Sequence, residues 1–338
     1  MNHFSEKLLT WYDIHQRQLP WRADPHPYYI LVSEFMLQQT RMETVLPYYH
    51  RFIEALPTIE QLASASEEQL LKLWEGLGYY RRVKNLHQTA QLIVAEHGGI
   101  VPSDPEVLKR FPGIGDYVAG AIASTAYQVK VSAIDGNVLR ILSRLYCNED
   151  DLSRAGPKRD LQSKLLALLP TERVGDFNQA LMELGALVCL PNARPLCETC
   201  PVSADCCAYQ TADPLDFPRK KDRRKVPVHL KTVLVVRSEE AVLVEPFGPG
   251  LLEGLASFPM KEGHLSPADI KALYPEAIIS SLGPARHVFS HLKWDMIGYQ
   301  VLLAEPEADW TPLSRLDRLS FPTALAVYRS SLEGSVSP

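Results

Sequence analysis

The chain has 338 residues, of which 46% are hydrophobic and 22% are charged, with a net charge of −5. This composition excludes a wholly disordered chain, a collagen-like fibre and a disulfide-stapled miniprotein, and at about 150 residues per domain the length predicts two domains. No apolar run approaches the ~20 residues of a membrane span, so no membrane partner is expected. The first residues carry scattered charges and lack the apolar centre of a signal peptide, which predicts a cytoplasmic protein.

Residues 1–211 are predicted to form one helical domain. Apolar residues recur at helical spacing in segments such as Glu67–Trp74, Arg82–Glu96 and Asp160–Leu169, and proline and glycine residues separate these segments. Residues 212–228 combine proline and charge with few large apolar side chains, which predicts a linker.

Residues 229–338 have a different residue pattern, which predicts a second, α+β domain. The β-rich runs are His229–Arg237, Ala241–Glu245, Ala277–Ser281 and Trp294–Leu303.

A helix-hairpin-helix is predicted between Glu106 and Tyr127. A short helix ends at Phe111-Pro112, the turn Gly113-Ile114-Gly115 follows, and small residues fill a second helix at Ala119–Ala126. Because the two glycines lack side chains, backbone N–H groups at the second helix can contact a nucleic-acid phosphate without reading sequence. Taken by itself, a Gly-x-Gly turn is also compatible with a tight connection between packed helices.

Two carboxylates are candidates for acid–base chemistry. Asp135 precedes a glycine in Ala133–Arg140, where an isolated aspartate is usually a turn or N-cap residue. Glu34 lies among apolar residues in Leu31–Thr40, so it either faces solvent or has a raised pKa that suits proton donation. The pattern alone favours the solvent-facing position.

Cysteines are concentrated in one short segment. Cys189, Cys197, Cys200 and Cys206 are separated by seven, two and five residues. In a reducing compartment such clustering predicts a metal site rather than disulfides, and one Cys-x-x-Cys flanked by single cysteines favours an iron–sulfur cluster over zinc. Two cysteines are left over and are interpreted as structural: Cys147 and Cys207.

Together these motifs resemble the endonuclease III superfamily of base-excision DNA glycosylases. Within it, Ser33–Thr40, Asp135-Gly136-Asn137 and Phe289-Ser290-His291 resemble the MutY-type adenine DNA glycosylases. The resemblance implies an enzyme that removes adenine mispaired with 8-oxoguanine or guanine in duplex DNA. Nothing in the sequence requires more than a monomer. The resemblance also implies a multidomain fold, in which an all-α glycosylase module with a [4Fe-4S] loop precedes an α+β Nudix-like domain. No glutamate-rich Nudix helix is found, so the second domain is expected to bind rather than hydrolyse.

The resemblance also assigns the catalytic residues. Glu34 matches the general acid, Asp135 the carboxylate that stabilises the sugar cation, and Asn137 a residue that orients this site. Tyr117 stands where bifunctional relatives place a Schiff-base lysine, so a monofunctional glycosylase is expected. A glycosylase/lyase and a non-enzymatic DNA-binding module are the alternatives.

The remaining implied sites are for the base, the DNA and the metal. They are Trp21, Arg22 and Glu183 around the extruded adenine, Gln39 and Tyr79 near the oxidised guanine, Gly113 and Gly115 on the DNA backbone, Phe289, Ser290 and His291 as readers of the lesion, and Cys189, Cys197, Cys200 and Cys206 as cluster ligands.

Overall fold

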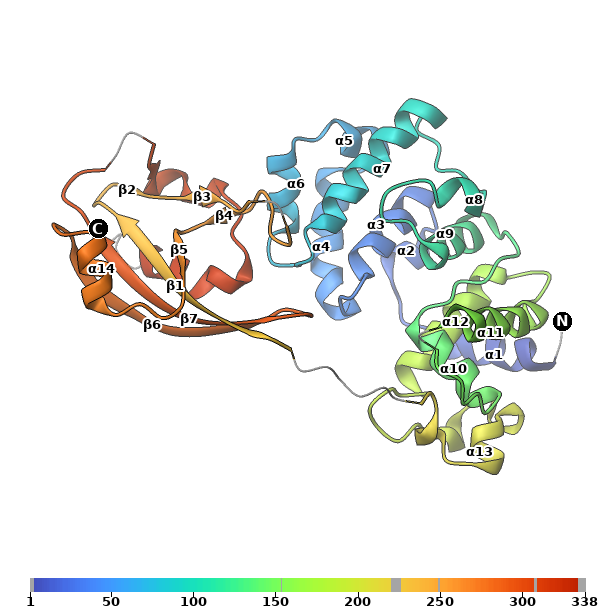
Figure 1. Ribbon diagram of the computed structural model, residues 1–338. Helices are drawn as coiled ribbons and strands as arrows, with labels where there is room; N and C mark the ends of the chain where they lie inside the picture. The colour runs from blue at the N-terminus through green and yellow to red at the C-terminus, as the bar shows by residue number, and fades with distance from the viewer. Residues whose placement is uncertain (1–2, 153, 220–225, 249, 307–308, 334–338) are drawn as a thin grey trace. The chain divides into compact units, whose positions relative to one another are not determined.

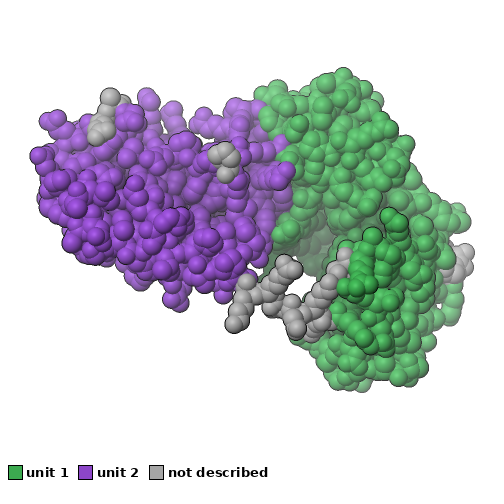
Figure 2. All heavy atoms as spheres, in the orientation of Figure 1, with its two compact units in different colours: residues 1–64, 85–222 green, residues 65–84, 223–338 purple. Residues whose placement is uncertain are grey.

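The computed structural model describes residues 3–152, 154–219, 226–248, 250–306 and 309–333. The chain forms two compact units, which Figure 2 colours separately. The helical unit comprises residues 1–64 and 85–222, and the sheet unit comprises residues 65–84 and 223–338. No helix in the described part of the chain is long and apolar enough to cross a membrane.

The N-terminal part is helical, as expected (Figure 1). The predicted helix at Arg82–Glu96 corresponds to α7, and Asp160–Leu169 overlaps most of α11. The elements are α1 (His3–His15), α2 (Pro20–Ala23), α3 (Pro27–Leu37), α4 (Met42–Ala55), α5 (Ile59–Ser64), α7 (Arg81–His97), α8 (Pro105–Leu108), α9 (Asp116–Tyr127), α10 (Gly136–Leu145), α11 (Ala155–Leu168), α12 (Val174–Leu187), η1 (Cys197–Thr199), η2 (Ser203–Asp205), α13 (Cys207–Thr211) and η3 (Pro214–Asp216).

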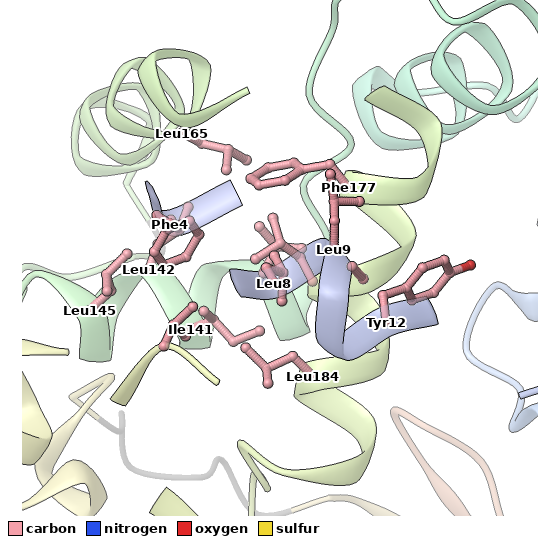
Figure 3. Packing of buried hydrophobic residues seen from close by; sticks show 14 of the residues in the cluster. Phe4, Leu8, Leu9, Tyr12, Ile141, Leu142, Leu145, Leu165, Phe177 and Leu184 are labelled. Atoms are coloured by element: carbon pink, nitrogen blue, oxygen red, sulfur yellow. The ribbon is translucent and has the colours of Figure 1, made fainter. Parts of the chain in front are cut away.

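A buried core joins the first helix to helices far along the chain. Leu8 of α1 packs in one apolar cluster with Leu142 of α10, Leu165 of α11 and Phe177 of α12 (Figure 3). These residues are fully buried, and burying each such side chain contributes about 1.5–3 kcal/mol. The core therefore fixes the position of α10. Asp135 caps the start of this helix, and Arg144 near its end contacts Cys189, the first of the four free cysteines.

The first part of the predicted linker is ordered. Phe217 is buried, and its carbonyl and that of Pro214 accept hydrogen bonds from Arg144 of α10 at 3.1 and 2.8 Å. Sequence analysis did not predict this attachment to α10, because the residues around Phe217 are mostly polar. The predicted linker's residues 220–225 lie outside the described residues.

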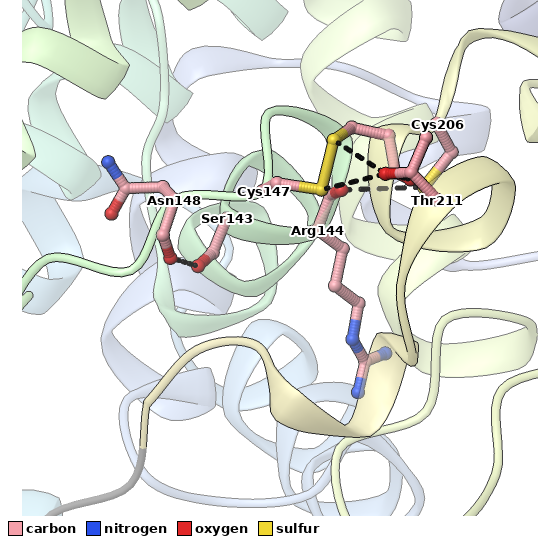
Figure 4. The surroundings of a disulfide bond; sticks show 7 residues. Ser143, Arg144, Cys147, Asn148, Cys206 and Thr211 are labelled. Atoms are coloured by element: carbon pink, nitrogen blue, oxygen red, sulfur yellow. Dashed lines mark hydrogen bonds between the residues drawn. A yellow bond between two sulfur atoms is a disulfide. The ribbon is translucent and has the colours of Figure 1, made fainter.

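The expectation of a metal site rather than disulfides is wrong for one of the clustered cysteines, Cys207. Cys147 and Cys207, interpreted as structural leftovers, are joined in a disulfide with Cα atoms 5.6 Å apart (Figure 4). The other four cysteines are free thiols. The pairing was missed because 60 residues separate the two cysteines and only the fold brings them together.

Cutting this disulfide with Cys147→Ser should lower the free energy of unfolding of the helical unit. For a separation of 60 residues, the chain-entropy model gives a loss of about 4 kcal/mol. Alkylation of the denatured, unreduced protein followed by mass spectrometry should leave Cys147 and Cys207 unmodified. Labelling of both residues would show that the pair does not form.

The sheet unit contains one mixed sheet, as the predicted α+β domain requires. Its strand order is β6-β7-β1-β2-β8, with β5 also paired to β1, and β1 and β7 run parallel over ten residue pairs. Its elements are α6 (Glu67–Trp74), β1 (Val228–Arg237), β2 (Ala241–Val242), β3 (Glu245–Pro246), β4 (Ala256–Ser257), β5 (Met260–Glu262), α14 (Pro267–Leu273), β6 (Ile278–Val288), β7 (Lys293–Leu302), β8 (Thr311–Pro312), η4 (Leu313–Arg318), η5 (Thr323–Leu325) and α15 (Ala326–Glu333).

The second part of β1, Thr232–Arg237, is buried, and its apolar run Val233–Val236 is continuous. Val233 and Val235 enter one apolar cluster, whereas Leu234 and Val236 enter the other. Successive side chains of a strand point to opposite faces, so each face of the sheet supports its own core.

Residues 65–84 belong to the sheet unit, although sequence analysis placed them in the helical domain. Helix α6 itself was predicted with its observed bounds, and Ser66 caps it by accepting from the Gln69 N–H at 3.2 Å. Just beyond the helix, the Glu75 carboxylate accepts hydrogen bonds from the Phe321 N–H at 3.2 Å and from Arg329 at 2.8 Å. These partners lie about 250 residues away, so no local pattern could have indicated them.

Candidate active site

The helix-hairpin-helix has the predicted turn. The first helix, α8, ends at Leu108, three residues before the expected end, and α9 begins at Asp116. Gly113 has φ +80°, and a Cβ atom there would lie 2.7 Å from the Phe35 ring, so only glycine fits. The space beside Gly115, the N-cap of α9, is open. The exposed N-terminus of α9 can therefore approach a phosphate closely.

Glu34 lies near the end of α3, and its carboxyl is buried rather than solvated. Its Oε2 atom is buried and has no hydrogen-bond partner among the described residues. Burial raises the pKa of Glu34 to about 7, the Tyr117 hydroxyl opposes this rise by hydrogen bonding, and the nearby Asp135 adds to it. The sequence pattern alone favoured solvent exposure, so this interpretation is corrected. A carboxyl that retains its proton near neutral pH suits a general acid.

Asp135 has the opposite environment. It is the N-cap of α10, where Oδ1 accepts from the Val138 N–H at 2.8 Å and Oδ2 accepts from the Asn137 amide at 2.7 Å. These two donors fix the orientation of the carboxylate, as a group that faces a developing cation requires. The N-cap reading and the catalytic reading of Asp135 are thus compatible.

Asn137 connects Asp135 to the cysteine segment. While its amide donates to Asp135, its Oδ1 accepts from the buried Arg140 guanidinium at 3.0 Å. Arg140 also donates to the carbonyls of Cys189 at 2.9 Å and Gly185 at 2.8 Å. A continuous chain of hydrogen bonds therefore runs from the Asp135 carboxylate to the first cysteine.

Tyr117 occupies the first turn of α9, beside Glu34. Burial, followed by the charge of Glu34, raises the pKa of the Tyr117 phenol well above its usual value, so the hydroxyl stays neutral. The hydroxyl also lies 3.6 Å from the sulfur of Met182. Tyr117 can orient groups through its hydroxyl, but it supplies no amine.

Glu183 of α12 is fully buried between two guanidinium groups. Its carboxylate oxygens lie 2.6 Å from Arg22 Nη2 and 2.8 Å from Arg17 Nε. Sequence reasoning missed Arg17, which belongs to no quoted motif and comes from the connection between α1 and α2. The Nε atom of Arg22 is buried without a hydrogen-bond partner among the described residues, so it is available to a ligand. The neighbouring Trp21 ring is buried, and its centroid lies 4.8 Å from that of the Tyr49 ring in an edge-on arrangement.

The two residues expected near the oxidised guanine share an unusual backbone conformation. Gln39 has φ +57° and Tyr79 has φ +51°, a region that L-residues with side chains rarely adopt. Such conformations cost about 1–3 kcal/mol and cluster at functional sites. Gln39 lies in the helical unit and Tyr79 in the sheet unit.

Tyr79 is supported by Arg82, a residue that sequence reasoning did not single out. The buried Arg82 guanidinium lies 5.3 Å from the centre of the Tyr79 ring and donates to the Gly78 carbonyl at 2.9 Å. It also lies 5.3 Å from the Trp74 ring, so it is stacked between two aromatic side chains.

Phe289, Ser290 and His291 lie in the turn between β6 and β7, which the Phe289 N–H closes by donating to the Leu292 carbonyl at 2.9 Å. The Phe289 ring lies edge-on to Trp294 at 4.9 Å, whereas Ser290 and His291 are exposed. Tyr79, Phe289 and Ser290 line one pocket of about 130 Å³ in the sheet unit. The structure thus brings together residues that are about 210 positions apart.

The four predicted ligand cysteines are close enough to interact electrostatically. Burial raises the pKa of Cys200 to about 12, and Cys189, Cys206 and Cys197 add to the rise. Four thiolates here would repel one another, so a positively charged metal centre is needed to hold them ionised. Within the described ranges, no three ligand-type side chains are spaced to hold a single metal ion. Thiol groups of this kind are ligands of both zinc sites and iron–sulfur clusters.

Comparison with known proteins defines the class first. Residues 32–166 match the HhH-GPD superfamily of base excision DNA repair proteins, and residues 232–328 match the NUDIX domain. The structure of a thermostable thymine-DNA glycosylase is similar, with a TM-score of 0.56 and 27% identity over 61% of this chain and 94% of that one. The helical unit is that of a base-excision DNA glycosylase.

The particular family follows from the sequence relatives. The adenine DNA glycosylase of Mus musculus is 36% identical, covering 91% of this chain and 72% of its own length. That of Schizosaccharomyces pombe is 32% identical, covering 98% of this chain and 90% of its own length. The chain belongs to the adenine DNA glycosylases.

Proposed function

We propose that the chain hydrolyses the N-glycosidic bond of adenine mispaired with 8-oxoguanine, or with guanine, in duplex DNA, and that it acts as a monomer. The observation that carries the proposal is the pair Glu34 and Asp135: two neighbouring carboxyls, of which one has a buried, unpaired oxygen and the other has both oxygens hydrogen-bonded. The buried Glu34 carboxyl suits proton donation, whereas the Asp135 carboxylate is held in place by its two donors.

The adenine must leave the helix stack to reach these groups. In the proposed reaction, Glu34 donates its proton to adenine N7 as the C1′–N9 bond breaks, and the bonding electron pair leaves with the base. The buried Arg22 Nε, which has no partner among the described residues, is available to the base edge, and Glu183 holds the Arg22 guanidinium in place.

The sugar left behind is an oxocarbenium-like cation, which the Asp135 carboxylate stabilises. Water then adds to C1′. Its oxygen and one of its hydrogens become the hydroxyl group of the abasic sugar, and its other proton is transferred to the Glu34 carboxylate. The products are free adenine and an intact strand with an abasic site. Since Tyr117 supplies no amine, no imine can form there to cleave the strand.

Recognition of the base opposite adenine is assigned to the sheet unit. The pocket lined by Tyr79, Phe289 and Ser290 combines aromatic rings, which replace lost stacking, with an exposed hydroxyl beside the His291 ring. Hydrogen-bonding groups of this kind suit the N7–H and O8 atoms that distinguish 8-oxoguanine from guanine. The helix-hairpin-helix, through Gly113 and Gly115, is assigned to the DNA backbone.

We also infer that Cys189, Cys197, Cys200 and Cys206 hold a [4Fe-4S] cluster, which would supply a structural centre for this segment. The purified protein should be brown, with broad absorption near ~400 nm and about four irons per chain. Colourless protein with stoichiometric zinc would overturn this assignment.

The activity is tested by a single-turnover assay on an end-labelled duplex with adenine opposite 8-oxoguanine. An adenine–guanine duplex tests the second mispair, and an adenine–thymine duplex is the control. Cleavage that appears only after hot alkali, and only in the mispaired duplexes, is the expected result. Cleavage without alkali would indicate a lyase, and tight binding without cleavage would indicate a binding module.

A further inference from the structure

Arg144, one residue before the end of α10, is a buried cation that contacts the cysteine segment at two places. Its Nη1 donates to the Cys189 sulfur at 3.0 Å and to the Leu190 carbonyl at 3.1 Å. Its Nε donates to the carbonyls of Pro214 at 2.8 Å and Phe217 at 3.1 Å. The residue is only 3% exposed, so these contacts replace water.

These acceptors lie at the two ends of residues 189–217, which contain all four free cysteines. One guanidinium therefore closes the whole segment onto α10. The middle of the segment is attached to the same place, because Cys207 is bonded to Cys147, two residues beyond α10, and the Cys206 thiol donates to the Arg144 carbonyl at 3.6 Å (Figure 4).

The charge of Arg144 has no carboxylate to balance it. Its side-chain acceptors in the described part of the chain are three carbonyl oxygens and one sulfur. A buried cation is costly unless a negative group lies beside it. A cysteine sulfur bound to a cluster carries negative charge, and hydrogen bonds to such sulfurs tune a cluster's stability and potential.

We propose that Arg144 is a positioning residue for the iron–sulfur centre: it donates to the Cys189 sulfur and holds both ends of residues 189–217, and so retains the cluster. This role rests on the cluster assigned above. Arg140 also contacts Cys189, but its guanidinium donates to Asn137 and to the carbonyls of Cys189 and Gly185, so it holds only the first end of residues 189–217.

The test compares Arg144→Gln and Arg144→Lys with the wild type. Arg194→Gln is the matched control, because Arg194 is in the same segment but its side chain is 78% exposed and lies 4.0 Å from Asp213. Bleaching of the visible absorption in chelator should be about tenfold faster for Arg144→Gln, as for other groups that support metal ligands. Arg144→Lys, which keeps the charge but not the fork of donors, should be intermediate, and Arg194→Gln should behave as wild type.

Far-UV circular dichroism separates cluster loss from unfolding, and Arg144→Lys remains informative if the glutamine variant does not fold. Folded Arg144→Gln that bleaches at the wild-type rate would overturn the proposal, and so would equal bleaching of Arg194→Gln. If the wild type contains no iron, the cluster assignment fails separately. Limited proteolysis then tests whether Arg144 holds the segment on α10. Cleavage within residues 190–217 that is faster in Arg144→Gln than in the wild type supports this role, and equal cleavage refutes it.

Discussion

Replacing Glu34 with glutamine should lower the single-turnover rate of adenine excision by about 10²–10⁴-fold, the usual contribution of a general acid. Glutamine has nearly the same size as glutamic acid and can still accept a hydrogen bond, but it cannot donate a proton to the departing base. Binding of the mispaired duplex should persist, because Glu34 lies on α3 and not on the hairpin turn at Gly113 and Gly115.

The assay uses the end-labelled adenine–8-oxoguanine duplex with alkali, and a gel-shift titration measures binding of the same duplex. A suitable control is Glu54→Gln, which removes an exposed carboxylate from α4. Unchanged turnover of Glu34→Gln would remove Glu34 from the mechanism, whereas equal loss in Glu54→Gln would indicate a general effect of charge.

The pH dependence gives a second readout for Glu34. Its pKa is raised to about 7 by burial, and the acid form is the active one, so the excision rate should fall as pH rises through about 7. Between about pH 4.5 and 7, Glu34 keeps its proton in the folded state but loses it in the unfolded chain. The free energy of unfolding should therefore fall as pH rises through this range. In Glu34→Gln, both dependences should disappear.

Much of the site was predictable because its parts are local. The glycine turn at Gly113, the N-cap at Asp135 and the spacing of the four cysteines each depend on neighbours within a few positions. The burial of Glu34 was not, since it depends on α9, about 80 residues away, which places Tyr117 beside the carboxyl. A single helix pattern cannot show which of its faces another helix will cover.

The same limit explains what was missed elsewhere. The ion pair of Arg17 with Glu183 and the disulfide of Cys147 with Cys207 join residues 166 and 60 positions apart. Arg144 belongs to no motif that the sequence analysis singled out, and its guanidinium is buried among the carbonyls of a later segment. Polar and ionic contacts of this kind have no periodicity, so composition and spacing cannot predict them.

Replacing Asp135 with asparagine should abolish excision while leaving the fold intact. Asparagine is as good an N-cap as aspartate, so its carbonyl can keep the hydrogen bond from the Val138 N–H that begins α10. What is lost is the negative charge facing the sugar cation, a loss worth on the order of 10³-fold in rate.

The Asn137 amide, which donates to Asp135 at 2.7 Å, would then face the amide group of the new side chain. To avoid two opposed donors, one amide must turn, and a turn of Asn137 would remove the acceptor that Arg140 uses at 3.0 Å. Asp135→Ala is the comparison variant, because it removes both the charge and the helix cap. Loss of the cap should lower the free energy of unfolding by a further ~1 kcal/mol. Melting temperatures and single-turnover rates of the two variants separate these effects. If Asp135→Asn excises adenine at the wild-type rate, the stabilising charge comes from another group, and the proposed pairing with Glu34 is wrong.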